Sequence, residues 1–520
     1  MVAPLTAAKG ARRPDLTRHA AKWGAVVLGG RVVGRVARLA VQVVLGRLLG
    51  PAAYGIYVLG RAAVDVLKTV GGMGSDRGGL RHLAIFRSTG DSKAARRVVR
   101  SALGVGAGVS LVTAVALFAG AGWVAGRFTE PGLEAPLRIF AIGLPVTTAA
   151  FILSGLLRGA DRIGADAWTS EILNPLVQLL LLGGVAFLAV GSRLAGAVWA
   201  FNAAFLVTAA AAFVILRRAV PPARSAGPSA FSGRGFWAYS LSLLAIELGA
   251  LLLTRLDRLV LGSAVTSAQL GLYGGASVFS QQNTFLLAAL NVAFAPRVAQ
   301  LESQGRTDDL ARLLKTLHRW TTTTSAPIIL VTVLLAPDLM GLMGPSFAAA
   351  YRLLVILTVG QAVNTFAGSV GIVLNMTGNQ RLELRNTTAN VLLLPVLLVL
   401  LVPRYGPMGA AFAVAGSMSI INAARVAEVY WVFRIHPFSS ELWKVGVASS
   451  AALVVWLLVA PHTVMAGPIR LIVGSALIVA VYLLVTLQLG LNWADRRLVV
   501  AIRRRLLTRW GRVQRGGERG

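Results

Sequence analysis

The sequence predicts an all-α protein that crosses a membrane many times, and three observations lead to that fold class. Only 14% of its 520 residues are charged and 56% are hydrophobic, whereas soluble domains are about 25% charged. Stretches of about 20 mainly apolar residues, enough to cross a hydrocarbon core of about 30 Å, recur from Trp23 to Gly490. The loops between them alternate between strongly basic and nearly uncharged. Together these observations exclude a soluble globular protein.

Reading the apolar stretches in order gives about fourteen predicted transmembrane helices. The first two, residues 22–46 and 51–75, are the least apolar. The others cover residues 98–122, 135–158, 167–190, 194–216, 236–261, 270–294, 320–343, 350–375, 386–403, 408–432, 442–461 and 469–490.

The charge of the loops predicts the orientation of these helices. The second loop, which includes Arg77 and Arg81, is rich in Arg and Lys, as are the sixth and eighth loops and the C-terminal tail. The seventh loop, residues 263–269, has no charge at all. Positive loops remain in the cytoplasm, so we expect both termini there and an even number of spans. The basic N-terminus precedes a stretch without a clear small-residue cleavage site, which favours a retained first span.

An internal repeat predicts the division of the chain. Gly50-Pro-Ala-Ala-Tyr-Gly-Ile-Tyr57 is echoed by Leu270-Gly-Leu-Tyr273, and Gly159-Ala-Asp-Arg162 by Gly378-Asn-Gln-Arg381. Each repeat holds six spans, so we expect two parallel-repeat six-helix bundles plus two C-terminal helices. The expected boundaries are a basic cytoplasmic N-terminus 1–21, an N-lobe 22–218, a cytoplasmic linker 219–235, a C-lobe 236–434, helices thirteen and fourteen at 435–490, and a basic cytoplasmic tail 491–520.

The residue types that carry enzyme chemistry are sparse. The chain has no cysteine, which excludes disulfides, thiolate metal sites and a cysteine nucleophile. Its five histidines are scattered, and no Gly-Lys-Ser/Thr follows a glycine-rich turn, so no ATP-hydrolysis motif is present. We therefore expect no catalytic residue, metal or cofactor. The net charge of +31 is explained by cytoplasmic loops, so nucleic acid is not an expected partner.

The first two spans carry charges that a membrane helix normally avoids. In each span the charged residues are spaced i, i+4, i+7, which places them on one helical face. Six such charges would cost up to about 15 kcal/mol if they faced lipid, so we expect them to line a water-filled cavity that binds an anion. Arginine is well suited to bind phosphate bidentately. The residues are Arg31, Arg35 and Arg38 in the first span and Arg61, Asp65 and Lys68 in the second.

The later spans hold fewer charges. Arg255 and Arg258 of span seven are further candidates for the cavity. Four carboxylates are candidates for coupling to an ion gradient, namely Asp65, Glu171, Glu247 and Asp257. In span twelve the spacing of Arg425 and Glu428 is typical of a local, structural ion pair.

Two segments outside the spans show leucine and basic residues at helical spacing, Asp308–Trp320 and Leu498–Trp510. This pattern is typical of helices that rest on an anionic membrane surface, with docking to a partner as the alternative.

Several of these segments resemble the polysaccharide and oligosaccharide flippase branch of the multidrug/oligosaccharidyl-lipid/polysaccharide exporter superfamily, over nearly the whole chain. Leu48-Leu-Gly-Pro-Ala-Ala-Tyr-Gly-Ile-Tyr57, Leu256-Asp-Arg-Leu-Val-Leu-Gly262 and Tyr405-Gly-Pro-Met-Gly-Ala-Ala411 are similar to its motifs. Arg31-Val-Val-Gly-Arg35-Val-Ala-Arg38 is similar to the first helix of lipid II flippases. The resemblance implies Arg31 and Arg38 as headgroup ligands, with Arg38 one residue out of register.

What the resemblance implies is two lobes around a cavity, alternating access, and a polyprenyl-pyrophosphate saccharide as cargo. We therefore expect a multi-pass protein of the bacterial inner membrane that moves an undecaprenyl-pyrophosphate-linked oligosaccharide. Its partners would be that substrate, membrane lipids and a polysaccharide polymerase or export machinery, with the coupling ion left open. The alternatives are a lipid II flippase, a multidrug or cation antiporter, and a membrane glycosyltransferase or ligase. An antiporter favours an acidic or aromatic cavity, and an enzyme needs larger external loops than this chain has.

Overall fold

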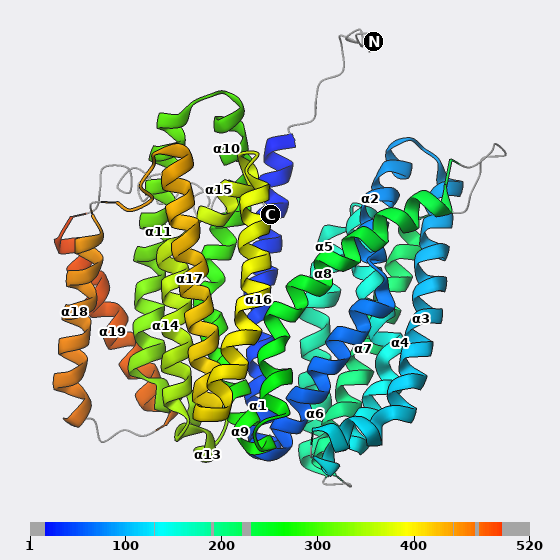
Figure 1. Cartoon of the computed structure of the whole chain (residues 1–520), viewed down its shortest axis with the longest axis horizontal. Helices are drawn as coiled ribbons and strands as arrows, with labels where there is room; N and C mark the ends of the chain where they lie inside the picture. The colour runs from blue at the N-terminus through cyan, green and yellow to red at the C-terminus, as the bar shows by residue number, and fades with distance from the viewer. Residues whose placement is uncertain are drawn as a thin grey trace, which may run out of the picture. The chain divides into compact units, whose positions relative to one another are not determined.

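The computed structural model of the chain describes residues 16–128, 130–188, 192–220, 230–439, 441–462 and 467–490. Every regular element in these ranges is helical, as predicted (Figure 1). Ten of the helices are long and apolar enough to cross a membrane. An eleventh span results if α14 (Tyr351–Ala367) and α15 (Val370–Met376), which are bent by 46° relative to each other, count as one. The chain is therefore a multi-pass membrane protein.

The predicted count of fourteen depends on three further helical stretches. Two are the halves of α1 (Leu16–Gly72), and the third is α11 (Thr307–Leu334). All three are largely helical where spans were predicted, but they are not among the ten helices that are long and apolar enough to cross a membrane. The count of fourteen and the cytoplasmic position of both termini stay predictions.

The chain forms two compact units, which we describe separately. The first unit extends to Val278 and includes Leu394–Ala410. It contains α1, α2 (Ser75–Ser88), α3 (Ser92–Arg127), η1 (Pro131–Leu133), α4 (Glu134–Gly159), α5 (Ile163–Asp166), η2 (Ala167–Leu173), α6 (Asn174–Leu188), α7 (Arg193–Ala219), α8 (Gly233–Gly262) and most of α9 (Ser267–Ser280).

The second unit covers Phe279–Leu393 and the chain from Ala411 onward. It contains η3 (Gln281–Thr284), α10 (Phe285–Ser303), α11, α12 (Ala336–Gly341), α13 (Pro345–Ala348), α14, α15, the first part of α16 (Gln380–Tyr405), most of α17 (Pro407–Phe433), α18 (Leu442–Val459), η4 (Ala460–His462) and α19 (Pro468–Gln488). The lobe boundaries drawn from the repeat stay a prediction.

Helix α1 joins the first two predicted spans at a single residue. Gly50 has φ 69° and ψ 175°, a conformation that glycine adopts without steric cost. Pro51 follows at the start of the second half, where its missing N–H would have no helical partner. The two halves therefore form one element with a sharp bend in place of a loop.

The core of the first unit lies between α2, α3, α4, α7 and α8. Leu83, Val98, Leu156, Leu216 and Phe236 are all buried in it. Small residues let the helix backbones approach closely, as is common in membrane proteins. This packing holds α2, which is too short to span a membrane, firmly against α4 and α8.

The second unit has two separate apolar cores. The first brings Leu310 and Leu314 of α11 against Val298 and Val370. Residues Asp308–Trp320, which we expected to rest on the membrane surface, thus form the first half of the continuous helix α11 and bury their leucines inside the protein. The other segment with this pattern, Leu498–Trp510, lies outside the described residues.

The second core attaches the two additional helices, α18 and α19, to α11. Trp456 and Tyr482 are buried there beside Ala326. The Tyr482 hydroxyl donates a hydrogen bond to the carbonyl oxygen of Thr323, at 3.0 Å.

Candidate functional site

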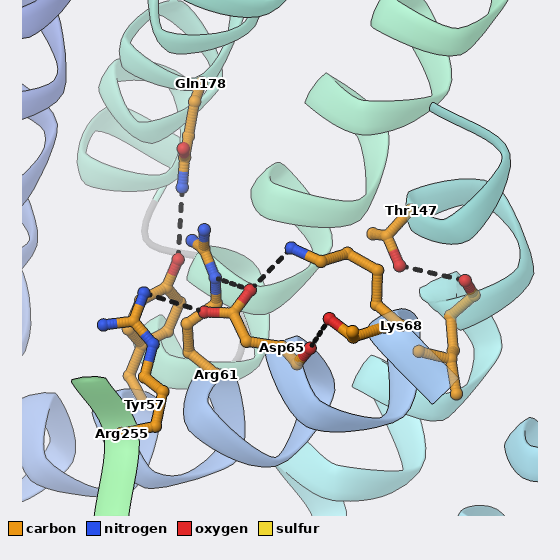
Figure 2. A network of polar contacts seen from close by, with 9 residues as sticks. Tyr57, Arg61, Asp65, Lys68, Thr147, Gln178 and Arg255 are labelled. Atoms are coloured by element: carbon orange, nitrogen blue, oxygen red, sulfur yellow. Dashed lines mark hydrogen bonds and ion pairs between the residues drawn. The ribbon is translucent and has the colours of Figure 1, made fainter. Parts of the chain in front are cut away.

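Asp65, in the second half of α1, is the centre of a cluster of ionic side chains, which we call the Asp65 cluster (Figure 2). Lys68 Nζ lies 2.8 Å from Asp65 Oδ1, and Arg61 Nε lies 3.5 Å from the same oxygen. Arg255, from α8, places a guanidinium nitrogen 3.1 Å from Asp65 Oδ2, without the alignment of a hydrogen bond. The cluster therefore contains three cations and one carboxylate.

Helical spacing accounts for the part of the cluster that α1 supplies. Residues three and four apart lie on one face, so Arg61 and Lys68 both reach Asp65 from the turns on either side. The Asp65 side chain is only 4% exposed, whereas those of Arg61, Lys68 and Arg255 are 30%, 18% and 26% exposed. The carboxylate is thus the buried centre, and the three cations remain partly accessible.

Aromatic rings from neighbouring helices support two of the cations. The Arg61 guanidinium lies over the Phe201 ring of α7, 4.5 Å from its centroid, and Lys68 Nζ lies 5.6 Å from the Phe151 centroid of α4. A cation over an aromatic face gains about 0.5–2 kcal/mol. These contacts hold the two cations in place.

A hydrogen bond on the same face of α1 extends the cluster towards α6. Gln178 donates to the Tyr57 hydroxyl at 3.2 Å, and Figure 2 shows this pair beside Arg61. Tyr57 is 1% exposed and lies in ring contact with Phe140, so its hydroxyl is fixed in position.

The cluster carries a net charge of +2 where α1 packs against α8, a helix long and apolar enough to cross a membrane. One carboxylate cannot neutralise three cations, and each uncompensated charge in a membrane helix costs about 2.5–3.5 kcal/mol. An arrangement of this kind persists where the excess charge has access to water or to an anion. The site can therefore accept a multivalent anion through two guanidinium groups and one ammonium group.

The arginines of the first span lie beside a different element. Arg38 forms an ion pair with Glu171, and Arg35 lies within electrostatic reach of both. Glu171 belongs to η2, a π-helical segment of a type that is frequent at functional sites. Gly34 makes this approach possible, because a Cβ there would lie 2.3 Å from the Glu171 carbonyl oxygen. The side chain of Arg31 lies outside the described part of the structure.

The remaining candidates on α8 have separate partners. The Tyr273 hydroxyl donates to Asp257 Oδ2 at 2.7 Å, and Arg258 donates to the Ser277 hydroxyl at 2.8 Å. Asp257 and Arg258 are each 7% exposed, so they connect α8 to α9 inside the first unit. Arg255, on the same helix, is the residue that the structure brings to Asp65.

Glu247 lies apart from the Asp65 cluster, nearer the start of α8. Arg77 of α2 places its Nε 2.5 Å from Glu247 Oε1. The charge of the loops predicts only that Arg77 helps to orient the helices in the membrane, and it gives no indication of this ion pair.

In the second unit, ion pairs connect α16 with α17. Arg425 makes a two-pronged pair with Glu383, with its Nε 2.9 Å from Glu383 Oε2. Arg385 and Asn386 each donate to Glu428 at 2.5 Å. Arg425 and Glu428 thus bind across to the neighbouring helix, and the expectation of a local pair between them is wrong.

The described residues were also compared with the requirements of a metal site. In the described ranges, no group of three or more His, Asp or Glu residues is placed to hold a metal ion.

Sequence reasoning found the cationic face of α1 but missed what surrounds it. Phe201, Phe151, Tyr57 and Gln178 carry no signal in a transmembrane sequence, where aromatic and polar residues have many other uses. The partnership of Arg255 with Asp65 joins residues far apart in the chain, and helical spacing gives no information on such a contact.

Comparison with known proteins identifies relatives over most of the chain. A family described as polysaccharide biosynthesis protein matches residues 44–346, more than half of the chain. The protein named "Probable flippase AglR" of Haloferax volcanii is 24% identical over 369 residues, which cover 68% of this chain and 74% of that protein.

Two solved structures share the fold. The lipid II flippase MurJ, in an inward closed conformation, superposes with a TM-score of 0.67 at 13% identity, covering 88% of this chain and 97% of that one. A multidrug resistance MATE family transporter of the MOP superfamily, in an inward-facing conformation, gives a TM-score of 0.64 at 14% identity, covering 79% of this chain and 98% of that one. At these identities the likeness concerns the fold alone.

Proposed function

The chain belongs to the polysaccharide biosynthesis protein family, and on this premise we propose that it is a flippase for a saccharide linked through pyrophosphate to a polyprenyl lipid. Its similarity to a probable flippase and its shared fold with flippases and exporters support a transporter of this superfamily. The substrate class is the finer proposal, with an undecaprenyl-pyrophosphate oligosaccharide as the cargo.

The observation that carries the proposal is the net charge of the Asp65 cluster. A pyrophosphate linkage brings multiple negative charges and many acceptor oxygens into the membrane. Arg61 and Arg255 offer guanidinium forks to such a group, and Lys68 offers an ammonium group. Asp65 keeps these cations together when no anion is bound, so the site does not have to assemble during binding.

The same cluster disfavours the alternative functions. A transporter of cationic drugs would meet like charges at Arg61, Lys68 and Arg255, which costs affinity. Lipid II carries the same pyrophosphate linkage, so a lipid II flippase remains an alternative within the same mechanism. A role for Asp65, Glu171, Glu247 or Asp257 in ion coupling, and partnership with a polymerase or export machinery, stay predictions.

The test is binding of polyprenyl-pyrophosphate saccharide to the purified protein in detergent. We expect Arg61→Gln and Arg255→Gln each to weaken binding by about 10- to 150-fold, because each removes a charged hydrogen-bond donor worth about 1.5–3 kcal/mol. Arg138→Gln is the matched control, because Arg138 is half exposed and ion-paired with Glu134 at 2.7 Å. It should bind as the wild type does.

Two outcomes would contradict the proposal. One is equal affinity in the wild type, Arg61→Gln and Arg255→Gln. The other is preference for a polyprenyl alcohol over the pyrophosphate form, since only the latter has the charge that the cluster is proposed to bind. Inorganic pyrophosphate as competitor should displace the lipid-linked form if the headgroup alone is recognised.

A further inference from the structure

Asp76 of α2 and Glu247 of α8 form a pair of buried carboxyl groups in the first unit, away from the Asp65 cluster. Asp76 is 2% exposed and Glu247 is 9% exposed. The buried oxygens Asp76 Oδ1 and Glu247 Oε2 receive no hydrogen bond from the N–H and O–H groups of the described residues. The two carboxyl groups nevertheless lie within hydrogen-bonding reach of each other.

Close backbone packing forces the two groups together. A Cβ on Gly74, just before α2, would lie 2.0 Å from the Ser240 carbonyl oxygen of α8. A Cβ on Gly155 of α4 would lie 2.1 Å from the carbonyl oxygen of Asp76 itself. With α4 on one side and α8 on the other, α2 has no room to turn Asp76 towards water.

The charged groups around the pair are too few to hold two carboxylates. Arg77 is ion-paired with Glu247 but is 52% exposed, so water screens much of its charge. Arg158 of α4 acts on Asp76, but its Nε also lies 3.5 Å from Asp166 Oδ2 of α5.

The third helix packed against α2 contributes only peripheral charges. Near its start α3 carries basic residues, of which the last two lie at the exposed surface: Lys93, Arg96, Arg97 and Arg100.

Simple charge counting then favours one proton between the two groups. With that proton, Asp76, Glu247 and Arg77 together are neutral. Without it they carry one net negative charge in a site that water barely reaches, and two carboxylates in contact repel each other strongly. A proton shared between paired carboxyl groups is how protein sites relieve this repulsion.

We propose that Asp76 and Glu247 are a proton-binding site, in which one shared proton holds α2 against α8 and its release lets the two helices separate. The inference needs no assumption about what the protein transports. Its ligand is a proton, and a sodium ion bound by the same oxygens is the competing assignment.

Infrared spectroscopy of the purified wild-type protein tests the first part. A protonated carboxylic acid gives a carbonyl stretching band that is separate from the carboxylate bands and shifts in heavy water. We expect this band at neutral pH without sodium, and we expect it to disappear on raising the pH. A wild-type protein without the band at neutral pH would overturn the proposal, as would a band that sodium removes at constant pH.

Matched variants assign the band to the pair. Asp76→Asn and Glu247→Gln each replace a carboxyl group by an amide of the same shape. Each variant keeps one carboxylate and gains an amide N–H that can donate a hydrogen bond to it, so we expect both proteins to fold. Both variants should lose the band. Glu134→Gln, at a half-exposed ion pair, should keep it. Persistence of the band in both pair variants would rule out the assignment.

Arg77→Gln provides a second, independent readout. Loss of the guanidinium removes the cation that favours ionised Glu247, so the band should persist to higher pH than in the wild type. A band that titrates at lower pH, or at the same pH, contradicts the assigned geometry.

Hydrogen–deuterium exchange tests the link to helix packing. After correction for the intrinsic pH dependence, exchange in Ser75–Ser88 should rise as the wild-type band disappears. In Glu247→Gln, which cannot lose the proton, exchange in this helix should stay low over the same pH range. Rising exchange in both proteins would show that the proton does not control the packing. Headgroup binding is measured separately at the Asp65 cluster, so either proposal can fail alone.

Discussion

Gly55 of α1 and Gly271 of α9 lie against each other in a reciprocal contact. A Cβ on Gly55 would lie 1.8 Å from the Ser267 carbonyl oxygen and 2.9 Å from the Gly271 nitrogen. A Cβ on Gly271 would lie 2.0 Å from the Pro51 carbonyl oxygen and 3.0 Å from the Gly55 nitrogen. Each glycine thus faces the residue four positions before the other. This is the pattern expected when two copies of one motif meet across a local two-fold axis.

The contact predicts a strong effect of adding one methyl group. Gly55→Ala and Gly271→Ala should each destabilise the protein, at or above the upper end of the about 1–3 kcal/mol that overpacking costs, because a backbone atom must move. Thermal unfolding followed by tryptophan fluorescence measures this. Gly104→Ala and Gly120→Ala in α3 are the controls, since both sites face open space. There alanine should be neutral or stabilising, by up to about 1 kcal/mol.

Removing the carboxylate of the Asp65 cluster should destabilise the fold more than removing an exposed one. Asp65→Asn leaves three cations without their counter-ion. Removing one partner of a buried ion pair lowers the free energy of unfolding by about 3–5 kcal/mol. Because the cations are partly exposed, we expect the lower end of this range. Adding Lys68→Met should recover part of the loss, because one unpaired charge is removed. An Asp65→Asn protein as stable as Glu134→Gln would contradict this account.

Glu171→Gln should increase affinity for a pyrophosphate headgroup, in contrast to the losses expected at Arg61 and Arg255. Glu171 forms an ion pair with the Arg38 guanidinium, and both side chains are partly exposed. Such a pair is worth about 0.2–1 kcal/mol, so its removal should strengthen binding by up to about 5-fold if Arg38 contacts the headgroup. Titration of headgroup binding in Glu171→Gln and in Glu171→Gln/Arg38→Gln shows whether Arg38 contacts the headgroup. An unchanged affinity in both would remove Arg38 from the binding site.

Asp91 should make stability depend on pH in the acid range. Its side chain accepts hydrogen bonds from the backbone N–H groups of Ala94 at 2.8 Å and Ala230 at 3.0 Å, and both lower its pKa below the ordinary value. A lowered pKa in the folded state means that this stability is present above the unfolded-state value of about 3.9 and is lost as the pH falls through the folded-state pKa. In Asp91→Asn the Tm should therefore fall less between about pH 5 and pH 3. An identical pH profile in both proteins would show that the contact is not stabilising.

The sequence predicted the parts of this fold that depend on local composition. Spans such as 98–122 and 442–461 are apolar apart from one basic residue near the start of each, and α3 and α18 form there. The break after Ala367 was not predicted, because it depends on one glycine, Gly368 at φ 74°, inside an otherwise apolar stretch. The surface helix expected at Asp308–Trp320 proved to be part of α11, since periodicity shows which face is apolar but not what covers it.

For the candidate site, too, the sequence predicted what depends on one helix and not what depends on contacts between helices. Spacing along one helix correctly placed Arg61, Asp65 and Lys68 on a common face. It could not identify Arg255 as a partner, because that contact depends on how α1 and α8 pack. Asp76 and Arg77 were overlooked for a different reason: they stand in a basic segment whose charge was fully explained by membrane orientation.

The reciprocal glycine contact also allows the charged residues near the two motifs to be compared position by position. Gly55 and Gly271 are 216 residues apart, and with the same offset in sequence Arg61, Asp65 and Lys68 correspond to Ser277, Gln281 and Thr284. Likewise Leu251 and Thr254 correspond to Arg35 and Arg38. The reverse comparison gives the same result, because Leu39, Val41 and Gln42 stand at the positions that correspond to Arg255, Asp257 and Arg258 of α8. At these positions each motif is charged where the other is neutral. The Asp65 cluster therefore needs a side chain from both helices, and neither helix could form it alone.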